Sequence, residues 1–164
     1  PLLLLAGPLM DPRIFLPQLM ALSPLCPLHL PQRLNPGSVE AMAEALLPGA
    51  PDRFALLGHG TGGMVAMEVL RRAPGRLTRL ILVSTDPLTD PPAVSVAREN
   101  AVVKARAGRF EQVIESDPCV QDYAQRGDCD DLAALMADML RAAGPEGFAA
   151  HVRARQRRPM SAAG

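Results

Sequence analysis

The sequence predicts an α/β fold in which a parallel sheet with flanking helices is followed by an all-helical segment. Apolar runs at residues 2–5, 53–57 and 80–83 have the composition of buried parallel strands. Segments with apolar residues at helical spacing alternate with these runs, which is typical of parallel strands joined by right-handed crossovers. From residue 93 to residue 158 only helical patterns remain, so we expect a helical cap over one end of the sheet.

Proline, glycine and capping residues divide the first half of the chain into elements. Residues 13–22 carry apolar side chains at helical spacing, and the prolines of "PLCPLHLP" limit any strand there to a short one at a sheet edge. Ser38 is the predicted N-cap of a second helix, which Pro48 and Gly49 end. A third helix is predicted over residues 61–73, ended by a further proline and glycine.

We expect the chain to divide into an α/β core (1–90), a helical cap (91–158) and a tail (159–164), within one structural domain. A chain of 164 residues with 48% hydrophobic content is long enough for one core. The helical patterns of the cap are "PAVSVARENAVVKARAG", "RFEQVIESD", "DDLAALMADMLRAAG" and "PEGFAAHVRARQRR". Pro145 opens the last of them, since proline is favoured at a helix start.

The charge balance argues against nucleic-acid and membrane partners. Lys plus Arg and Asp plus Glu number 17 each, so no net field attracts a polyanion. The basic group near the end of the last helix complements the helix dipole better than it makes an RNA site; it comprises Arg153, Arg155, Arg157 and Arg158. The apolar start "PLLLLAG" is far shorter than the roughly 18 apolar residues of a membrane span and is interpreted as a buried strand.

The cysteines indicate a reducing compartment. Cys26, Cys119 and Cys129 are odd in number and lack paired metal-ligand spacing, so we expect neither a disulfide framework nor a metal site. A cytoplasmic protein without a cofactor is the expectation.

The stretch "FALLGHGTGG" (54–63) carries two overlapping motifs. Gly58, Gly60 and Gly63 spell G-x-G-x-x-G after a strand and before a helix, with Asp86 after the next strand. This pattern predicts a dinucleotide site in which backbone N–H groups hold a pyrophosphate and Asp86 accepts from a ribose hydroxyl. The bulky His59 and a strand–helix unit that precedes the motif argue against it.

The same residues also match the nucleophile elbow G-x-S-x-G, here Gly58 to Gly62. The segment "FALLGHGTGGMVAMEVLRRAPGRLTRLILVSTDP" resembles the elbow region of the α/β-hydrolase superfamily, and "LLLLAGPLMD" is similar to its oxyanion-loop strand. With the helical cap the resemblance extends to about Pro159. It implies a partial α/β-hydrolase sheet and an ancestry among ester or carbon–carbon bond hydrolases.

Two departures from the family pattern fall at the implied catalytic centre. Gly60 stands where the family has its serine, so no hydroxyl is present for a base to activate. The resemblance implies that Thr61 gives a backbone N–H to the oxyanion and that the residue after Gly7 gives the second. That residue is Pro8, which has no N–H, unless a one-residue shift brings in Leu9.

The family's late acid and final histidine are also not found. No histidine follows His151, and His29, His59 and His151 are each interpreted as surface or packing residues rather than a general base. Asp86 lies where some relatives place the acid, but an Asp before a proline is also an ordinary turn residue. The sequence therefore predicts a degenerate, truncated hydrolase that is not catalytically competent as this chain.

Two further expectations concern ligands and partners. Methionines beside the elbow and in the cap could line a cleft for a small acyl or ester ligand, or fill the core; they are Met64, Met67, Met136 and Met139. A non-catalytic binding protein that uses this cleft stays open beside the hydrolase and dinucleotide interpretations. The apolar strand 80–83 would have an unpaired edge, which predicts a homodimer, a separate C-terminal partner, or a piece of a longer protein.

Overall fold

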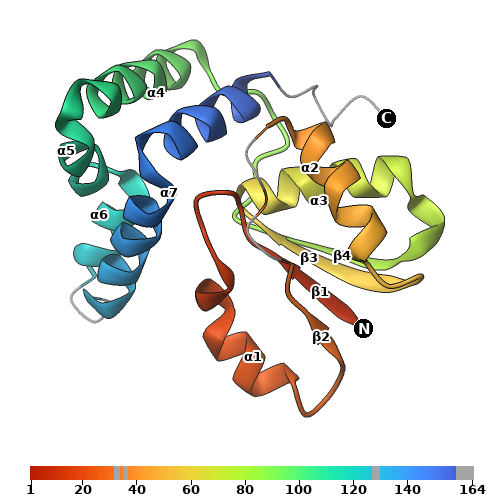
Figure 1. The fold of residues 1–164 in the computed structure, drawn as a ribbon. Coiled ribbons are helices and arrows are strands. Elements are labelled where there is room, and N and C mark those ends of the chain that lie inside the picture. Colours follow the sequence, from red (N-terminus) through yellow and green to blue (C-terminus); the bar gives the residue numbers. More distant parts are fainter. Residues whose placement is uncertain (32–33, 35–36, 127–129, 158–164) are drawn as a thin grey trace.

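The structure, a computed structural model, describes residues 1–31, 34, 37–126 and 130–157. In this part of the chain four strands form one parallel sheet in the order β2-β1-β3-β4 (Figure 1). The strands are β1 (Leu2–Leu5), β2 (Leu28–His29), β3 (Phe54–His59) and β4 (Leu77–Val83). The predicted α/β class is confirmed, and β2 is the short edge strand that its prolines indicate.

Helices pack on one face of the sheet, and a further helix with no buried residue lies on the other side. α2 (Val39–Leu46) and α3 (Thr61–Arg72) lie on one face, and α1 (Leu16–Leu22) lies on the other, beside β1 and β2 (Figure 1). The hydroxyl of Ser38 accepts a hydrogen bond from the backbone N–H of Ala41, which is the predicted N-cap.

The helix predicted over residues 13–22 is divided in the structure. A 3₁₀ turn (Pro12–Phe15) comes first, and α1 follows it. The backbone of Phe15 leaves helical geometry at φ −99° and ψ 9°. Pro17, in the first turn of α1, has no N–H to continue a single helix from the turn before it. The apolar spacing predicted a helix in this region, but it did not predict the break at Pro17.

β4 is longer than the predicted strand and is largely uncovered. It begins at Leu77, and in the described part of the chain it is the last strand on its side of the sheet. The apolar side chains of Ile81, Leu82 and Val83 are each about 40% exposed, at 41%, 43% and 40%. The sheet therefore ends in an apolar edge strand, as the sequence predicts.

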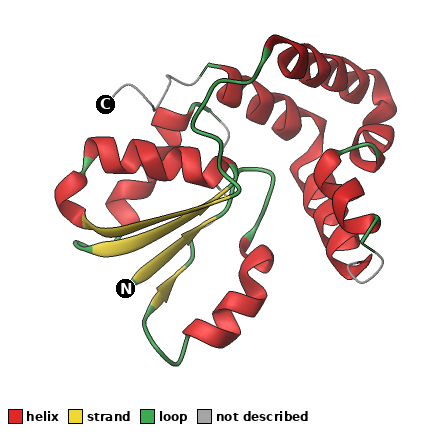
Figure 2. Ribbon diagram, turned by 180° about the vertical axis from the view of Figure 1, so that it is seen from behind, coloured by secondary structure: helices red, strands yellow, loops and turns green. Residues whose placement is uncertain are grey.

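The second half of the chain is all-helical and lies beside the end of the sheet where β3 meets α3 (Figure 2). Its helices are α4 (Pro92–Lys104), α5 (Phe110–Glu115), α6 (Pro118–Ala124) and α7 (Asp130–Gln156). α7 is interrupted at Gly144 (φ 71°, ψ 170°), and Pro145 opens its second segment as predicted. Cys129, Arg158 and the expected tail lie outside the described residues.

α6 was not predicted, although its start carries a recognisable signal. The carboxylate of Asp117 accepts a hydrogen bond from the backbone N–H of Cys119, and Pro118 occupies the first helical position. An Asp followed by Pro is a favoured helix start. Only seven residues follow before the helix ends, which is too short for apolar periodicity to be visible.

Two hydrophobic clusters hold the molecule together. One, the sheet cluster, packs α2 and α3 against β1 and β3, and the other, which we call the cap cluster, joins α4, α5, α6 and α7. Leu9, in the turn after β1, belongs to the cap cluster, whereas Ala154, near the end of α7, belongs to the sheet cluster. The helical half of the chain is therefore packed onto the sheet through the turn after β1 and the end of α7.

Candidate functional site

The turn between β3 and α3 has the backbone shape of a nucleophile elbow. Gly60 sits at φ 57° and ψ −122°, a region that residues with a side chain adopt only under strain. Its N–H donates to the carbonyl of Val83 over 2.9 Å, which fixes the turn to β4. A Cβ built on Gly60 meets no atom within 4 Å, so a side chain here would project into open space.

The glycines that flank Gly60 are required by close packing. A Cβ on Gly62 would overlap the carbonyl oxygen of Leu5 in β1, and a Cβ on Gly58 would lie 2.5 Å from the Cα of Gly63. A Cβ on Gly63 would overlap the side chain of Thr85. The contacts of β1, β3 and the segment after β4 with α3 therefore account for these glycines. The dinucleotide hypothesis, with Gly58, Gly60, Gly63 and Asp86, stays a prediction.

The turn after β1 lies beside the start of α3, where the sequence places the oxyanion loop. The N–H of Met10 donates to the carbonyl of Gly7 over 2.9 Å, so Pro8 and Leu9 are the central residues of this turn. A Cβ on Gly7 would lie 3.2 Å from the Cβ of Thr61. Pro8 is buried and has no N–H to offer a ligand.

Asp86, the weak acid candidate, is an exposed turn residue. Its Oδ1 accepts a hydrogen bond from the backbone N–H of Leu88 over 2.8 Å, which forms an Asx turn. A buried acid, Asp90, follows four residues later. Its side chain is 6% exposed and pairs with Arg155 at 3.1 Å and with Arg98 at 2.8 Å.

Asp90, Arg98, His151 and Arg155 form what we call the buried charge cluster. It joins the segment after β4, α4 and the second part of α7. Nη1 of Arg155 also lies 3.4 Å from the hydroxyl oxygen of Thr61, which brings the cluster to the first residue of α3. Arg155 was expected only to complement the helix dipole; its side chain turns inward instead and is 14% exposed.

His151 is a buried packing residue, as predicted, and it lies among charges. It is 8% exposed, and burial lowers the pKa of its imidazole to about 3. The cations of Arg155 and Arg98 lower this pKa further, whereas Asp90 opposes them. Burial also lowers the pKa of His59, at the end of β3, while His29 lies in the edge strand β2.

Sequence reasoning missed this cluster because its members are far apart in the chain. One usable signal was present: His151 and Arg155 are four residues apart, so they share one face of the helix. Of the methionines that the sequence predicts as cleft lining or as core, at least two belong to the core. Met64 packs in the sheet cluster and Met136 in the cap cluster.

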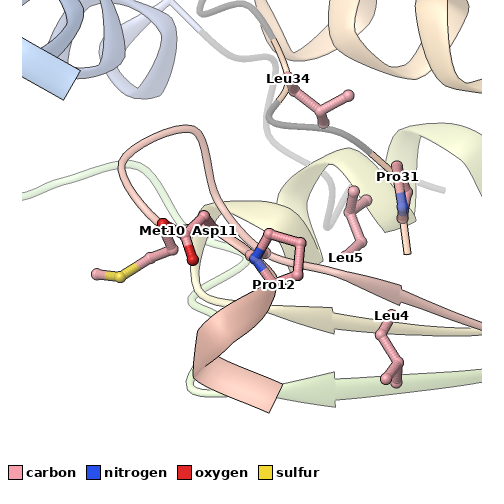
Figure 3. A pocket seen from close by; sticks show the side chains of 8 residues that line it. Leu4, Leu5, Met10, Asp11, Pro12, Pro31 and Leu34 are labelled. Atoms are coloured by element: carbon pink, nitrogen blue, oxygen red, sulfur yellow. The ribbon is translucent and has the colours of Figure 1, made fainter. Parts of the chain in front are cut away.

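A small pocket lies on the other side of the turn after β1, and Figure 3 shows the side chains that line it. None of the predicted site residues borders it; its lining is Leu4, Leu5, Ala6, Met10, Asp11, Pro12, Pro31 and Leu34. Its volume of about 10 Å³ is enough for roughly one water molecule. It therefore does not serve as a cleft for an acyl ligand.

The described residues show neither a metal cluster nor a membrane-spanning helix. Within residues 1–31, 34, 37–126 and 130–157 no group of three or more His, Cys, Asp or Glu side chains is arranged to hold a metal ion. Over the same ranges no helix has the length and apolar character needed to cross a membrane. Cys26 and Cys119 are free thiols.

Comparison with solved structures identifies the fold. A thermophilic esterase from Thermogutta terrifontis, solved with malate bound, superposes with a TM-score of 0.83 over 98% of this chain at 24% identity. The chain is an α/β-hydrolase-fold protein. It spans 65% of the length of that esterase.

Comparison with curated proteins indicates the class of protein from which the chain descends. The chain is 42% identical over 50 residues to the pimeloyl-[acyl-carrier protein] methyl ester esterase of Aromatoleum aromaticum, a match that covers 30% of this chain and 20% of the relative. It is 29% identical over 114 residues to the enzyme of the same name from Chromobacterium violaceum, covering 66% of this chain and 45% of the relative. No protein-family model matches. The chain is thus of hydrolase ancestry, of the esterase type, and spans less than half of these relatives.

Proposed function

We propose that this chain is a degenerate member of the ester and carbon–carbon bond hydrolases that does not cleave its substrate through an acyl-enzyme. The observation that carries the proposal is Gly60 at the elbow, with the strained backbone of a nucleophile position and no hydroxyl. An acyl-enzyme needs an oxygen or sulfur nucleophile within reach of a base.

Neighbouring groups do not replace the nucleophile, its general base or the second oxyanion donor. The hydroxyl of Thr61 is buried in the first turn of α3 and lies near the guanidinium of Arg155, a cation that accepts no proton. Pro8 withholds one oxyanion donor, and loss of one such donor costs about 10²- to 10³-fold in turnover in working enzymes. Asp86 is occupied in its own turn.

We expect no turnover of an activated ester by this chain. Release of p-nitrophenolate from p-nitrophenyl butyrate should equal the buffer rate, and a fluorophosphonate probe should leave the protein unlabelled. Gly60→Ser should remain within about tenfold of the same background, because a hydroxyl without a base is a weak nucleophile. Gly60→Ala is the matched control, since it imposes the same backbone strain without the oxygen.

Ester cleavage above background by the unmodified chain would contradict the proposal. A fluorophosphonate adduct mapped to Thr61 would contradict it as well, because it would identify a nucleophile one residue from the expected position.

A second function, a non-catalytic receptor for a small acyl ligand under the cap, is favoured by the buried charge cluster. Arg155 reaches from α7 to the first residue of α3 and is largely shielded from solvent. The relatives are named for a methyl ester of a pimeloyl group, which agrees with an acyl ligand. Binding without turnover requires a site for the ligand and no nucleophile.

We also expect the 164-residue chain to self-associate through β4. The exposed backbone edge and apolar side chains of this strand can pair with the same strand of a second copy. Leu82→Lys should reduce dimer formation, because a lysine on an edge strand opposes strand pairing. Sedimentation velocity at increasing concentration measures the effect, with the cap variant Leu132→Lys as the control, since Leu132 is as exposed (42%) but lies in α7. A monomer at all concentrations would contradict this expectation.

A further inference from the structure

Two glycines bend the helical half of the chain. Gly108 (φ 77°, ψ 12°) lies between α4 and α5, and Gly144 (φ 71°, ψ 170°) interrupts α7. A Cβ built on either glycine would meet no atom within 4 Å, so close packing does not require glycine here, unlike at Gly58 and Gly62. Glycine is favoured at both positions by the positive φ of a sharp bend.

The bends divide the helical half into two arms (Figure 1). The inner arm consists of α4 and the second segment of α7 (145–156), and the outer arm consists of α5, α6 and the first segment of α7 (130–143). Arg106 precedes Gly108 and pairs with Glu146 on the inner side of the bends at 2.7 Å. Glu111 follows Gly108 and pairs with Arg141 on the outer side. Neither pair connects one arm with the other, so both pairs persist if the arms rotate relative to each other.

The two arms are attached to the sheet half of the chain in different ways. The inner arm is fixed by the buried pair of Arg155 with Asp90 and by Ala154, which belongs to the sheet cluster. The outer arm has an exposed ion pair: Nη1 of Arg13 lies 2.8 Å from Oδ2 of Asp138, and these side chains are 45% and 57% exposed. Because exposed pairs contribute little stability, this attachment of the outer arm is weaker than that of the inner arm.

We propose that the outer arm is a hinged unit that rotates about Gly108 and Gly144 while the inner arm stays fixed to the sheet. The ion pair between Arg13 and Asp138 is the latch of this unit. Leu9, in the turn after β1, packs in the cap cluster, and this cluster continues from one arm into the other. The motion is therefore a small rotation in which packed helices slide, and the arms do not separate. Release of the latch makes the turn after β1 more accessible to solvent.

An aromatic contact crosses from the outer arm to the inner arm next to the bends. The ring centroids of Phe110 and Phe148 are 5.9 Å apart, and the ring planes are tilted by 57°. Aromatic pairs are favourable over centroid distances of about 4.5 to 7 Å, so this pair can act as the pivot of a small rotation. The competing explanation is a rigid corner in which both glycines only end a helix. A rigid corner has one arrangement and does not respond to loss of the latch.

The test is the distribution of distances between two nitroxide labels, measured by double electron–electron resonance. The labels are attached to Leu132→Cys in the outer arm and Leu70→Cys in α3, both at exposed positions, in a chain whose native cysteines are changed to serine. A second protein carries the exposed Val96→Cys of the inner arm in place of Leu132→Cys. The outer pair should show two distances and the inner pair one. Asp138→Asn should raise the ratio of open to closed outer arm about two- to fivefold.

Two further variants separate the latch and the hinge from general effects of substitution. Glu146→Gln is the matched control for Asp138→Asn, since it removes an exposed ion pair on the inner side and should leave the outer distribution unchanged. Gly108→Asn should narrow the outer distribution, because Asn adopts positive φ but has less backbone freedom than glycine, and a Cβ here meets no atom. One narrow distance for the outer pair, both with and without Asp138→Asn, would overturn the inference.

Hydrogen exchange without labels covers the case in which a labelled protein does not fold. In Asp138→Asn the backbone amides of residues 9–14 should exchange about two- to fivefold faster than in the unmodified chain, because Leu9, Met10 and Ile14 pack against the cap cluster. The amides of α5 and of residues 130–143 should keep their exchange rates, since the outer arm rotates as a unit. Unchanged exchange of residues 9–14 would contradict the hinge. Faster exchange throughout the outer arm would contradict it as well, because it would indicate local unfolding.

Discussion

Gly62→Ala is expected to destabilise the protein by about 3 kcal/mol, the upper end of what overpacking costs. The added Cβ would overlap the carbonyl oxygen of Leu5 and lie 2.9 Å from its carbonyl carbon. These atoms belong to the backbone of β1, which is hydrogen-bonded to β2 and β3 and cannot move without distorting the sheet. The free energy of unfolding in urea, monitored by circular dichroism, measures the loss.

Gly147→Ala is the matched control for this prediction. A Cβ at Gly147, in the second segment of α7, would lie 3.5 Å from the Cβ of Ala143, an ordinary contact. Alanine inside a helix is more favourable than glycine by about 0.5 to 1 kcal/mol, so this variant should be slightly stabilised. Equal stabilities of the two variants would show that α3 does not approach β1 as closely as the structure has it.

Sequence reasoning predicted most of the fold because its elements are marked locally. Apolar runs gave β1, β3 and β4, and Ser38 gave the start of α2. The errors fall where a local signal was weak or was overridden. Pro17 divided a helix whose apolar spacing looked continuous, and α6 was too short to show a period.

One part of the candidate site could likewise be predicted from the sequence, and another part could not. The elbow was predictable because the spacing of Gly58, Gly60 and Gly62 along the chain specifies a tight turn, and the structure gives Gly60 the strained backbone that such a turn requires. The pairing of Asp90 with Arg155 was not predictable, because 65 residues separate the two and only the tertiary fold brings them together. A single sequence does not indicate which of its charges meet across such a distance.

Under the proposed function, glycine at position 60 would let the elbow keep its shape without a nucleophile. A residue with a side chain at φ 57° is strained, whereas glycine adopts this conformation freely. The hydrogen bonds of the turn use only its backbone: its N–H donates to Val83, and its carbonyl accepts from Gly63 and from the hydroxyl of Thr85. A change from serine to glycine at this position would therefore leave every one of these contacts intact.

The stability of the protein is expected to fall steeply with acid because of His151. The pKa of this imidazole is lowered to about 3 in the folded protein by burial, so it stays neutral there, whereas the unfolded chain takes up the proton below a pKa of about 6.5. Between these values the unfolded state binds one more proton than the folded state. This residue alone should then reduce the free energy of unfolding by about 1.4 kcal/mol for each pH unit below 6.5.

The difference between His151→Gln and the unmodified chain isolates this effect from the carboxylates, which titrate at lower pH. Urea unfolding between pH 7 and pH 5 should give a smaller slope of stability against pH for His151→Gln, because glutamine takes up no proton in either state. Parallel curves for His151→Gln and the unmodified protein would mean that the imidazole is protonated in the folded state. The second part of α7 would then be more open to water than its packing against Thr61 and Asp90 implies.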